Sequence, residues 1–306
     1  MPARFATIDI GTNSVLLLVA ERREDDTFRP VAERMDITRL GRGVDRTGRL
    51  APEALADTVE AIARFATEAR SLGAREVVAT ATSAARDAKN GHELIERAAA
   101  VGVPVEIIAG EREAGLSWRA VAQDFSRAGE KLAVIDIGGG STELIVGAGA
   151  SFSFRHSFDV GSVRLTERHV RGDPPTAESI AEVQRALGEA LATVPRVDGG
   201  TRAVGVAGTF TTICAIADRV EPYDATRVHG RVMQLPEVGA VGKRLAAMPL
   251  AERRELPGLD PKRADVIVAG SFLAHAIVRA LGLDRVTIGD RGVRWGYLYE
   301  RFGDPR

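Results

Sequence analysis

One short segment occurs twice in this chain, and the repeat limits what the chain can fold into. Residues 5–21 read FATIDIGTNSVLLLVAE, and residues 132–148 read LAVIDIGGGSTELIVGA. With an offset of 127 positions, Asp9 falls on Asp136 and Ser14 falls on Ser141. In each copy, apolar residues lead into and out of a turn of glycine and small polar residues, a pattern typical of a β-hairpin. The chain therefore contains one structural unit twice, which indicates two related halves.

Segments with strand and helix patterns alternate after both copies. In the first half we expect strands at 15–20, 28–38, 76–81 and 103–108, and helices at 51–72 and 111–125. In the second half we expect strands at 152–160, 202–206 and 286–288, and helices at 163–171, 176–194, 261–281 and 291–302. This alternation predicts an α/β protein, and the hairpins predict mixed sheets. We predict one domain over 1–127, a second over 128–290, and a closing segment, 291–306, that packs back on the first.

Composition excludes several classes of partner. The 306 residues carry a net charge of −1, and 45% of them are hydrophobic, which is enough for two cores without a basic surface for nucleic acid or an anionic membrane. We find no signal peptide and no apolar run near the roughly 20 residues that span a bilayer. The single cysteine, Cys214, lies in a segment with the pattern of a buried helix. We therefore expect a soluble cytoplasmic protein with no nucleic-acid or membrane partner.

The two turns have the chemistry of phosphate-binding loops. Glycine allows a tight turn with positive φ angles and a close approach of the backbone to a ligand. Successive N–H groups in such a turn form a concave site for phosphate oxygens, and hydroxyl groups add donors. The phosphate-binding residues predicted in this way are Gly11, Thr12, Asn13 and Ser14 in the first copy and Gly138, Gly139, Gly140, Ser141 and Thr142 in the second.

Carboxylates accompany both turns. Asp9, Asp136 and Glu143 stand beside the predicted anion sites, which is consistent when a divalent cation lies between carboxylate and phosphate. We therefore expect Mg²⁺, or another divalent cation, held by these residues. For one copy alone, an ordinary glycine turn remains the alternative. The repetition favours two related domains that offer phosphate loops from both sides of a cleft.

Further motifs point to a family. They are ATATSAARDAKNG (79–91), EIIAGEREAGLSW (106–118), GVAGTFTT (205–212) and IGDRGVRWG (288–296). Together with the hairpins, they resemble in order the exopolyphosphatase and guanosine pentaphosphate phosphohydrolase (Ppx/GppA) family. The hairpins by themselves resemble the actin, heat-shock-70 and sugar-kinase fold. The resemblance implies two actin-like, ribonuclease H-like domains with mixed sheets facing a central cleft, and a homodimer.

The resemblance also assigns roles to particular residues. It implies that Glu113 activates the attacking water, that Arg86 faces phosphate, and that Gly208 and Thr209 belong to a phosphate loop of the second domain. The family commonly has arginine at the position of Gly115 and an acidic residue at that of Arg112; the glutamate itself is retained.

Arg86 can also be interpreted without the family. Arg86 and Asn90 stand four residues apart at a helix start, so both can face a ligand, and a guanidinium there would bind phosphate through two nitrogens. The alternative for Arg86 is a surface salt bridge with Asp87 or Glu111. Glu113 alone would be interpreted as part of a solvated helix face.

Two groups of basic residues leave alternatives open. The stretch RLGRGVDRTGRL (39–50) either cradles a polyanion or is a solvated loop; its arginines are Arg39, Arg42, Arg46 and Arg49. We interpret a second group, Arg253, Arg254, Lys262 and Arg263, as surface charges. The five histidines show no spacing typical of a metal site.

The resemblance implies an exopolyphosphatase, which hydrolyses the terminal phosphate of inorganic polyphosphate by metal-assisted attack of a water that Glu113 activates. The alternative within enzymes is guanosine pentaphosphate (pppGpp) hydrolysis at the same site. A further alternative is an actin-like nucleotide-binding switch or filament former, in which residues 205–218 supply part of an adenosine pocket. Glu113 in its motif favours a hydrolase, and we find no sugar-binding aspartate that would indicate a sugar kinase.

Overall fold

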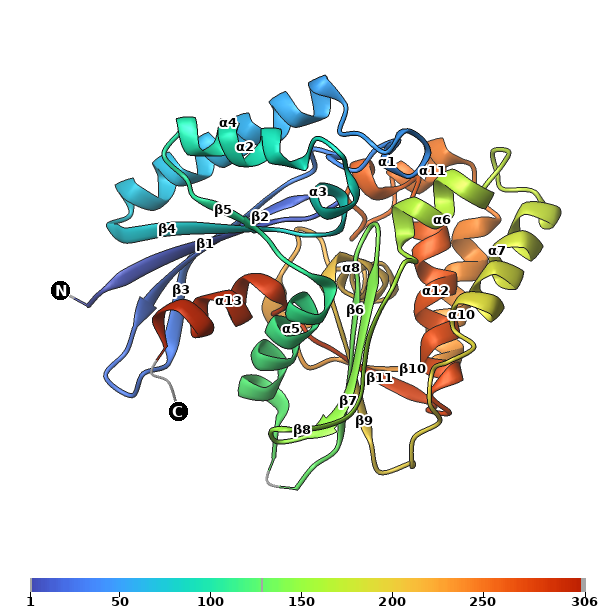
Figure 1. Cartoon of the computed structure of the whole chain (residues 1–306). Helices are drawn as coiled ribbons and strands as arrows, with labels where there is room; N and C mark the ends of the chain where they lie inside the picture. The colour runs from blue at the N-terminus through green and yellow to red at the C-terminus, as the bar shows by residue number, and fades with distance from the viewer. Residues whose placement is uncertain (1, 128, 304–306) are drawn as a thin grey trace. The chain divides into compact units, whose positions relative to one another are not determined.

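The chain forms two α/β units (Figure 1). The computed structural model describes residues 2–127 and 129–303. The first unit comprises Met1–Ala120 and Val293–Arg306, and the second comprises Val121–Gly292. One boundary lies inside helix α5 (Gly110–Phe125) and the other lies directly before α13 (Val293–Phe302). The sequence placed these boundaries at 127/128 and 290/291 instead.

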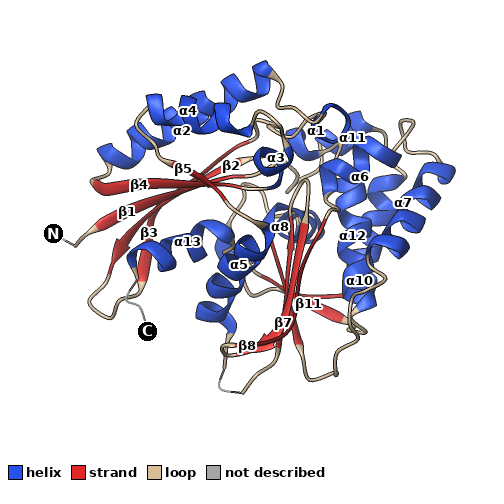
Figure 2. Cartoon of the chain, in the orientation of Figure 1, coloured by secondary structure: helices blue, strands red, loops and turns tan. Residues whose placement is uncertain are grey.

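The first unit contains a mixed sheet with the strand order β3-β2-β1-β4-β5 (Figure 2). Strand β1 pairs antiparallel with β2 and parallel with β4, and β4 is parallel to β5. The strands are β1 (Arg4–Ile10), β2 (Val15–Arg22), β3 (Phe28–Asp36), β4 (Ala74–Ala81) and β5 (Val105–Ile107). The predicted strands are confirmed.

Helices cover both faces of this sheet, which explains the continuous apolar run of β2. On one face, Leu17 packs in a core with residues of α2 (Pro52–Ser71) and α4 (Gly91–Ala100). On the other face, Leu18 packs with Trp295 and residues of α5 and α13. Adjacent strand residues point to opposite faces, so Leu17 and Leu18 enter different cores. Two short helices, α1 (Val44–Thr47) and α3 (Ser83–Asp87), complete this unit's described helices.

The second unit repeats the topology of the first. Its strand order is β10-β11-β9-β6-β7-β8, and β6 pairs antiparallel with β7 and parallel with β9. Read from β8, this is the order of the first sheet with β10 added at the edge. The strands are β6 (Leu132–Ile137), β7 (Thr142–Ala148), β8 (Ser151–Phe158), β9 (Arg202–Val206), β10 (Val232–Gln234) and β11 (Arg285–Ile288). The repeat in the sequence is therefore a repeat of the fold, and the predicted α/β class with two mixed sheets is confirmed.

An extensive core lies between the second sheet and its helices. Ile135 of the sheet packs there with Phe210, Cys214 and Leu273, each of them fully buried. Burial raises the pKa of the Cys214 thiol to about 11, so the thiol is protonated at neutral pH and fills space in the core as predicted. The helices are α6 (Ser162–His169), α7 (Ala177–Ala190), α8 (Ala207–Asp218), α9 (Ala225–Val228), α10 (Leu235–Ala246), α11 (Leu250–Arg254) and α12 (Ile267–Ala280), with a 3₁₀ turn at Pro261–Arg263.

The single helix predicted at 261–281 is divided in the structure. The side chain of Asp260 accepts from Lys262 N–H at 2.8 Å and caps a 3₁₀ turn. This turn precedes α12, which starts at Ile267. None of the described helices combines the length and the apolar character that crossing a bilayer requires.

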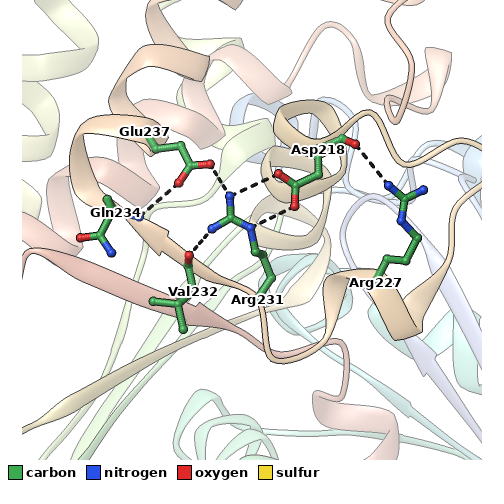
Figure 3. Close-up of polar contacts among 6 residues, drawn as sticks. All are labelled: Asp218, Arg227, Arg231, Val232, Gln234 and Glu237. Carbon is green, nitrogen blue, oxygen red and sulfur yellow. Dashed lines mark hydrogen bonds and ion pairs between the residues drawn. The ribbon is translucent and has the colours of Figure 1, made fainter.

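A cluster of charged side chains fixes the carboxyl end of α8 (Figure 3). Arg231 binds both carboxylate oxygens of Asp218, at 3.0 and 3.2 Å, and Oε1 of Glu237 at 2.6 Å. Arg231 also donates to the carbonyl of Val232, and Arg227 donates to the carbonyl of Asp218 at 3.4 Å. The hydrogen bonds that Arg231 donates to Asp218 raise the pKa of Arg231 above its ordinary value. This cluster joins α8 to β10 and α10, so the opposite end of α8, which carries Gly208, is presented by a well-anchored helix.

Candidate active site

The predicted site residues of the first unit follow the carboxyl ends of parallel strands. The turn at 11–14 follows β1, the segment with Arg86 follows β4, and the segment with Glu113 follows β5. Thr82 N–H donates to Ile10 O at 3.1 Å, and Ile108 N–H donates to Ala81 O at 3.0 Å. Because these strands are parallel and in register, their ends gather at one edge of the sheet, where α/β proteins commonly bind ligands.

In the first turn, the carbonyl oxygens of Thr12 and Asn13 accept hydrogen bonds, whereas the N–H groups of the same two residues are available to a ligand. The N–H of Gly11 donates to Ser14 O at 2.9 Å. Two N–H groups of the segment that follows β3 donate to the carbonyls of Thr12 and Asn13, at 2.8 and 3.0 Å. Within residues 2–127 and 129–303, the N–H groups of Thr12 and Asn13 donate to no oxygen. Neighbouring N–H groups without an oxygen partner suit an anion.

The second turn repeats this arrangement. The N–H of Gly138 donates to Ser141 O at 3.0 Å, as in the first copy. The first N–H groups of α6, from Ser162 and Val163, donate at 3.1 and 2.9 Å to the carbonyls of the turn's first two residues. The N–H groups of Gly139 and Gly140 find no oxygen among the described residues. Both copies therefore leave the same two successive N–H groups without an oxygen partner, although the accepting carbonyls are shifted by one position, from Thr12 and Asn13 to Gly138 and Gly139.

The glycines serve close approach and not a left-handed backbone. Among the described residues, neither Gly11 nor Gly138–Gly140 has a positive φ, so the expectation of positive φ angles in these turns is wrong. A Cβ on Gly11 or on Gly138 would lie 3.2 Å from the carbonyl of the residue three positions later. A Cβ on Gly161 would collide with Gly139 O. The backbone of α6 thus packs directly on the turn, and this contact requires glycine.

The hydroxyl groups are less available than the sequence suggested. Thr142 is fully buried in β7, and its Oγ1 donates to Val160 O at 2.6 Å. Thr209 Oγ1 donates to Ile137 O at 3.3 Å, which places the start of α8 beside the Gly138 turn. Both hydroxyls therefore support the backbone in this conformation, and for Thr142 this contradicts the expectation of a hydroxyl that donates to phosphate. Ser141 is 2% exposed, at the end of the turn.

Asp136 and Glu143 lie side by side. They are direct partners in the antiparallel register of β6 and β7, a relation that brings Cβ atoms to within about 5.5 Å of each other. Both are buried, and Ser157 Oγ donates to Glu143 Oε1 at 2.7 Å. In the first unit, Asp9 occupies the position of Asp136, but its partner across the hairpin is Leu16.

These carboxylates suit one kind of metal better than another. No group of three or more His, Cys, Asp or Glu side chains that could hold a metal ion occurs among the described residues, which does not fit a closed zinc site. A pair of carboxylates fits Mg²⁺, which takes one or two carboxylates and completes its shell with water and phosphate oxygens. The donor set of Asp136 and Glu143 is therefore compatible with Mg²⁺.

Arg86 and Glu113 form an ion pair. Arg86 Nη1 lies 3.2 Å from Glu113 Oε2 and donates to Ile108 O at 2.9 Å. Glu113 is 7% exposed in the first turn of α5, so it does not lie on a solvated helix face. The contact of Arg86 with Asp87 is longer, at 3.9 Å. The predicted base and the predicted phosphate-binding arginine, 27 residues apart in sequence, are thus brought together.

The two departures from the family pattern have simple structural consequences. Arg112 forms ion pairs with Glu106 and, at 2.7 Å, with Glu300 of α13. Both carboxylates raise the pKa of Arg112, and the hydrogen bond to Glu300 has the largest effect. Arg112 therefore joins α5 to its neighbours. A Cβ on Gly115 would meet nothing within 4 Å, so the position is open.

The prediction that Asn90 faces a ligand is wrong. It is 3% exposed, its Oδ1 accepts from Leu50 N–H at 2.8 Å, and its Nδ2 donates to Leu50 O at 3.2 Å. The side chain thus clamps a distant backbone segment.

Two arginines that we interpreted as surface charges are buried or partly buried. Arg253 is 3% exposed and lies 3.5 Å from Asp173 Oδ1, so the surface interpretation is wrong. Arg263 donates to Thr212 Oγ1 at 3.3 Å, and its guanidinium fills the space where a Cβ of Gly208 would stand. Burial lowers the pKa of Arg263. The signal in the sequence was Gly208, since only glycine leaves room for this guanidinium at the start of α8.

The fold and these sites together define an α/β protein of two related units, each with the same hairpin turn at the end of its first strand. The chain belongs to the Ppx/GppA phosphatase family, whose model matches residues 18–304. It is 37% identical to Exopolyphosphatase 2 of Mycobacterium tuberculosis, over 95% of this chain and 96% of that protein. It is 30% identical to the guanosine-5'-triphosphate,3'-diphosphate pyrophosphatase of Vibrio atlanticus, over 100% of this chain and 60% of that protein. Among solved structures, the Ppx/GppA family member of Aquifex aeolicus aligns with a TM-score of 0.82 and 33% identity, over 98% of this chain and 97% of that one. The chain is therefore a hydrolase of the phosphatase type.

Proposed function

We propose that this protein is an exopolyphosphatase, a phosphoric anhydride hydrolase that releases the terminal phosphate of inorganic polyphosphate. The observation that carries the proposal is the Arg86–Glu113 pair, at 3.2 Å, at the sheet edge where the N–H groups of Thr12 and Asn13 have no oxygen partner among the described residues. Similarity to an exopolyphosphatase along almost the whole of both chains supports it.

In this proposal, Glu113 orients the attacking water and accepts its proton. The carboxylate is well placed to do so, because Arg86 holds it in one orientation and the side chain is largely removed from solvent. A positioned general base contributes roughly 10²- to 10⁴-fold to the rate. Phosphoryl transfer depends for the rest on positioning and charge stabilisation.

Backbone amides and Arg86 supply that positioning. In this proposal, the N–H groups of Thr12 and Asn13 bind phosphate oxygens, and those of Gly139 and Gly140 are the corresponding donors of the second unit. Arg86 keeps Nη2 for a phosphate, because Nη1 makes its contacts with Ile108 and Glu113. A guanidinium that bridges base and substrate would bring the water and the phosphorus into a fixed relation.

We also propose that the enzyme uses Mg²⁺. Asp136 and Glu143 would hold the ion in the second unit, and Asp9 is the corresponding carboxylate of the first. When bound, the ion would offset negative charge on the phosphates. The family resemblance further implies a homodimer, which sedimentation of the purified protein tests.

A second candidate substrate is pppGpp. It is favoured by the 30% identity to a protein named for hydrolysis of guanosine-5'-triphosphate,3'-diphosphate. A terminal phosphate presents the same oxygens in both substrates, so the same residues would act on either.

The direct test is phosphate release, with Mg²⁺, from polyphosphates of several lengths, from pppGpp and from ATP. We expect the highest kcat/KM with polyphosphate. Dominant release from pppGpp would replace the substrate and keep the site. Hydrolysis of ATP alone would contradict the proposal and favour a nucleotide-binding switch.

A further inference from the structure

The segment Arg39–Leu50, RLGRGVDRTGRL, is the most basic stretch near the first turn, and its role is not explained by the catalytic site. It carries four arginines and one acidic residue, Asp45. We call it the arginine segment. A solvated loop needs no fixed backbone conformation, whereas a loop that binds a polyanion needs one.

The start of the arginine segment is attached to the first phosphate turn. Arg39 N–H donates to Asn13 O at 3.0 Å, and Gly41 N–H donates to Thr12 O at 2.8 Å. A Cβ on Gly41 would collide with the Thr12 side chain and would lie 3.1 Å from Ala84 of α3. The segment therefore begins in contact with the carbonyl groups of the turn whose N–H groups we assign to phosphate, and with the helix that carries Arg86.

The end of the arginine segment is attached to the motif that follows β4. Lys89 N–H donates to Gly48 O at 2.9 Å, and the buried Asn90 side chain forms two hydrogen bonds with the backbone of Leu50. Gly43 and Gly48 adopt positive φ angles of 75° and 65°. With both ends tied and these turns specified, the backbone between them is held in one conformation.

Two arginines on this fixed backbone are available to a ligand. Arg42 and Arg46 are exposed, and neither forms a salt bridge with any residue in the described part of the chain. Arg49, by contrast, lies 3.6 Å from Glu93. Other exposed arginines of this unit are paired too, for example Arg34 with Glu68 at 2.7 Å. Among the described residues, Arg42 and Arg46 share the unpaired state with Arg23 and Arg75 at the opposite end of the sheet, and they differ from these in standing on a backbone that is attached to the first phosphate turn.

We propose that Arg42 and Arg46 bind internal phosphates of a polyphosphate chain whose terminal phosphates lie at the Gly11–Ser14 turn. This inference rests on the proposed exopolyphosphatase function and adds a determinant of substrate length. Polyphosphate carries no base or sugar, so charge along the chain is what a protein can recognise, and a guanidinium binds phosphate oxygens through two donors. A substrate of a few phosphates ends at the turn. A long chain continues onto the arginine segment.

The test is the double variant Arg42→Gln/Arg46→Gln, with steady-state kinetics on long-chain polyphosphate and on tripolyphosphate. We expect KM for the long chain to rise about two- to thirtyfold, the range for two exposed charge contacts. The ratio of kcat/KM between long chain and tripolyphosphate should fall by the same factor. The dependence of the long-chain KM on salt should become shallower, because fewer cations contact the polyanion.

A matched control is Arg23→Gln/Arg75→Gln, which removes the same charge from the opposite end of the same sheet. Arg75 stands at the start of β4 and the exposed Arg23 directly follows β2, whereas the phosphate turn follows the carboxyl end of β1. We expect this control to keep the wild-type length preference. An equal loss in the control would show an effect of net charge and overturn the inference.

Two other results would overturn the inference while leaving the proposed function intact. One is an unchanged length preference in the Arg42→Gln/Arg46→Gln variant. The other is an equal loss on tripolyphosphate and on the long chain, which would make the arginines part of the terminal site. If the wild-type protein releases no phosphate from polyphosphate of any length, the proposed function fails, and this is recognised before any variant is compared.

Discussion

Replacing Glu113 by glutamine tests the proposed mechanism most directly. Glutamine keeps the size of the side chain and an oxygen that can accept from Arg86, but it cannot accept a proton from water. If Glu113 is the general base, kcat should fall roughly 10²- to 10⁴-fold while KM stays within a few-fold of wild type. Phosphate binding should persist, because the amides of Thr12 and Asn13 are unaffected.

The expected loss of stability is too small to explain such a fall. The substitution weakens one charge-assisted hydrogen bond of 3.2 Å, and Arg86 keeps its bond to Ile108 O at 2.9 Å. A hydrogen bond to a charged group contributes about 1.5–3 kcal/mol, and the amide recovers part of it. A protein with about 5–15 kcal/mol of unfolding free energy remains almost entirely folded after this loss. Thermal unfolding followed by circular dichroism measures the change.

Glu111→Gln is the matched control. Glu111 stands two residues earlier in the first turn of α5 but is exposed. Phosphate release should stay near wild type in this variant. Near wild-type turnover of Glu113→Gln, or an equal loss in Glu111→Gln, would refute the reasoning.

Three further predictions concern the metal, the second unit and the core. Chelation by EDTA should abolish phosphate release and added Mg²⁺ should restore it; full activity in EDTA would exclude the metal. Gly208→Ala should destabilise the protein by about 1–3 kcal/mol, because the new Cβ overlaps the Arg263 guanidinium, whereas Gly188→Ala, where a Cβ meets nothing within 4 Å, should not; calorimetry compares them. Burial raises the pKa of Cys214 in the folded protein from 9.0 to about 11. The protonated thiol therefore contributes to the free energy of unfolding below pH 9, and this contribution is lost as pH rises through 11. Between pH 9 and pH 11, the free energy of unfolding of wild type should fall by about 2 kcal/mol more than that of Cys214→Ala. An equal dependence on pH in both proteins would contradict the raised pKa of Cys214.

The sequence by itself determined the repeated hairpins, the α/β class and the candidate turns. These features depend on local patterns. The turn at 11–14 and the turn at 138–141 close the same hydrogen bond because their hairpins have similar residues at matching positions. The alternation of strands and helices then allowed few topologies, and both sheets adopted the same order.

Only the tertiary structure decided what the polar side chains do. Asn90 clamps Leu50, which is 40 residues away, and Arg263 donates to Thr212, which is 51 residues away. Nothing in the local sequence distinguishes these side chains from solvated ones, since polar residues have the same pattern whether they face water or a distant partner. The pairing of Arg86 with Glu113 follows the same rule, because two parallel strands had to end at one edge before the guanidinium and the carboxylate could meet.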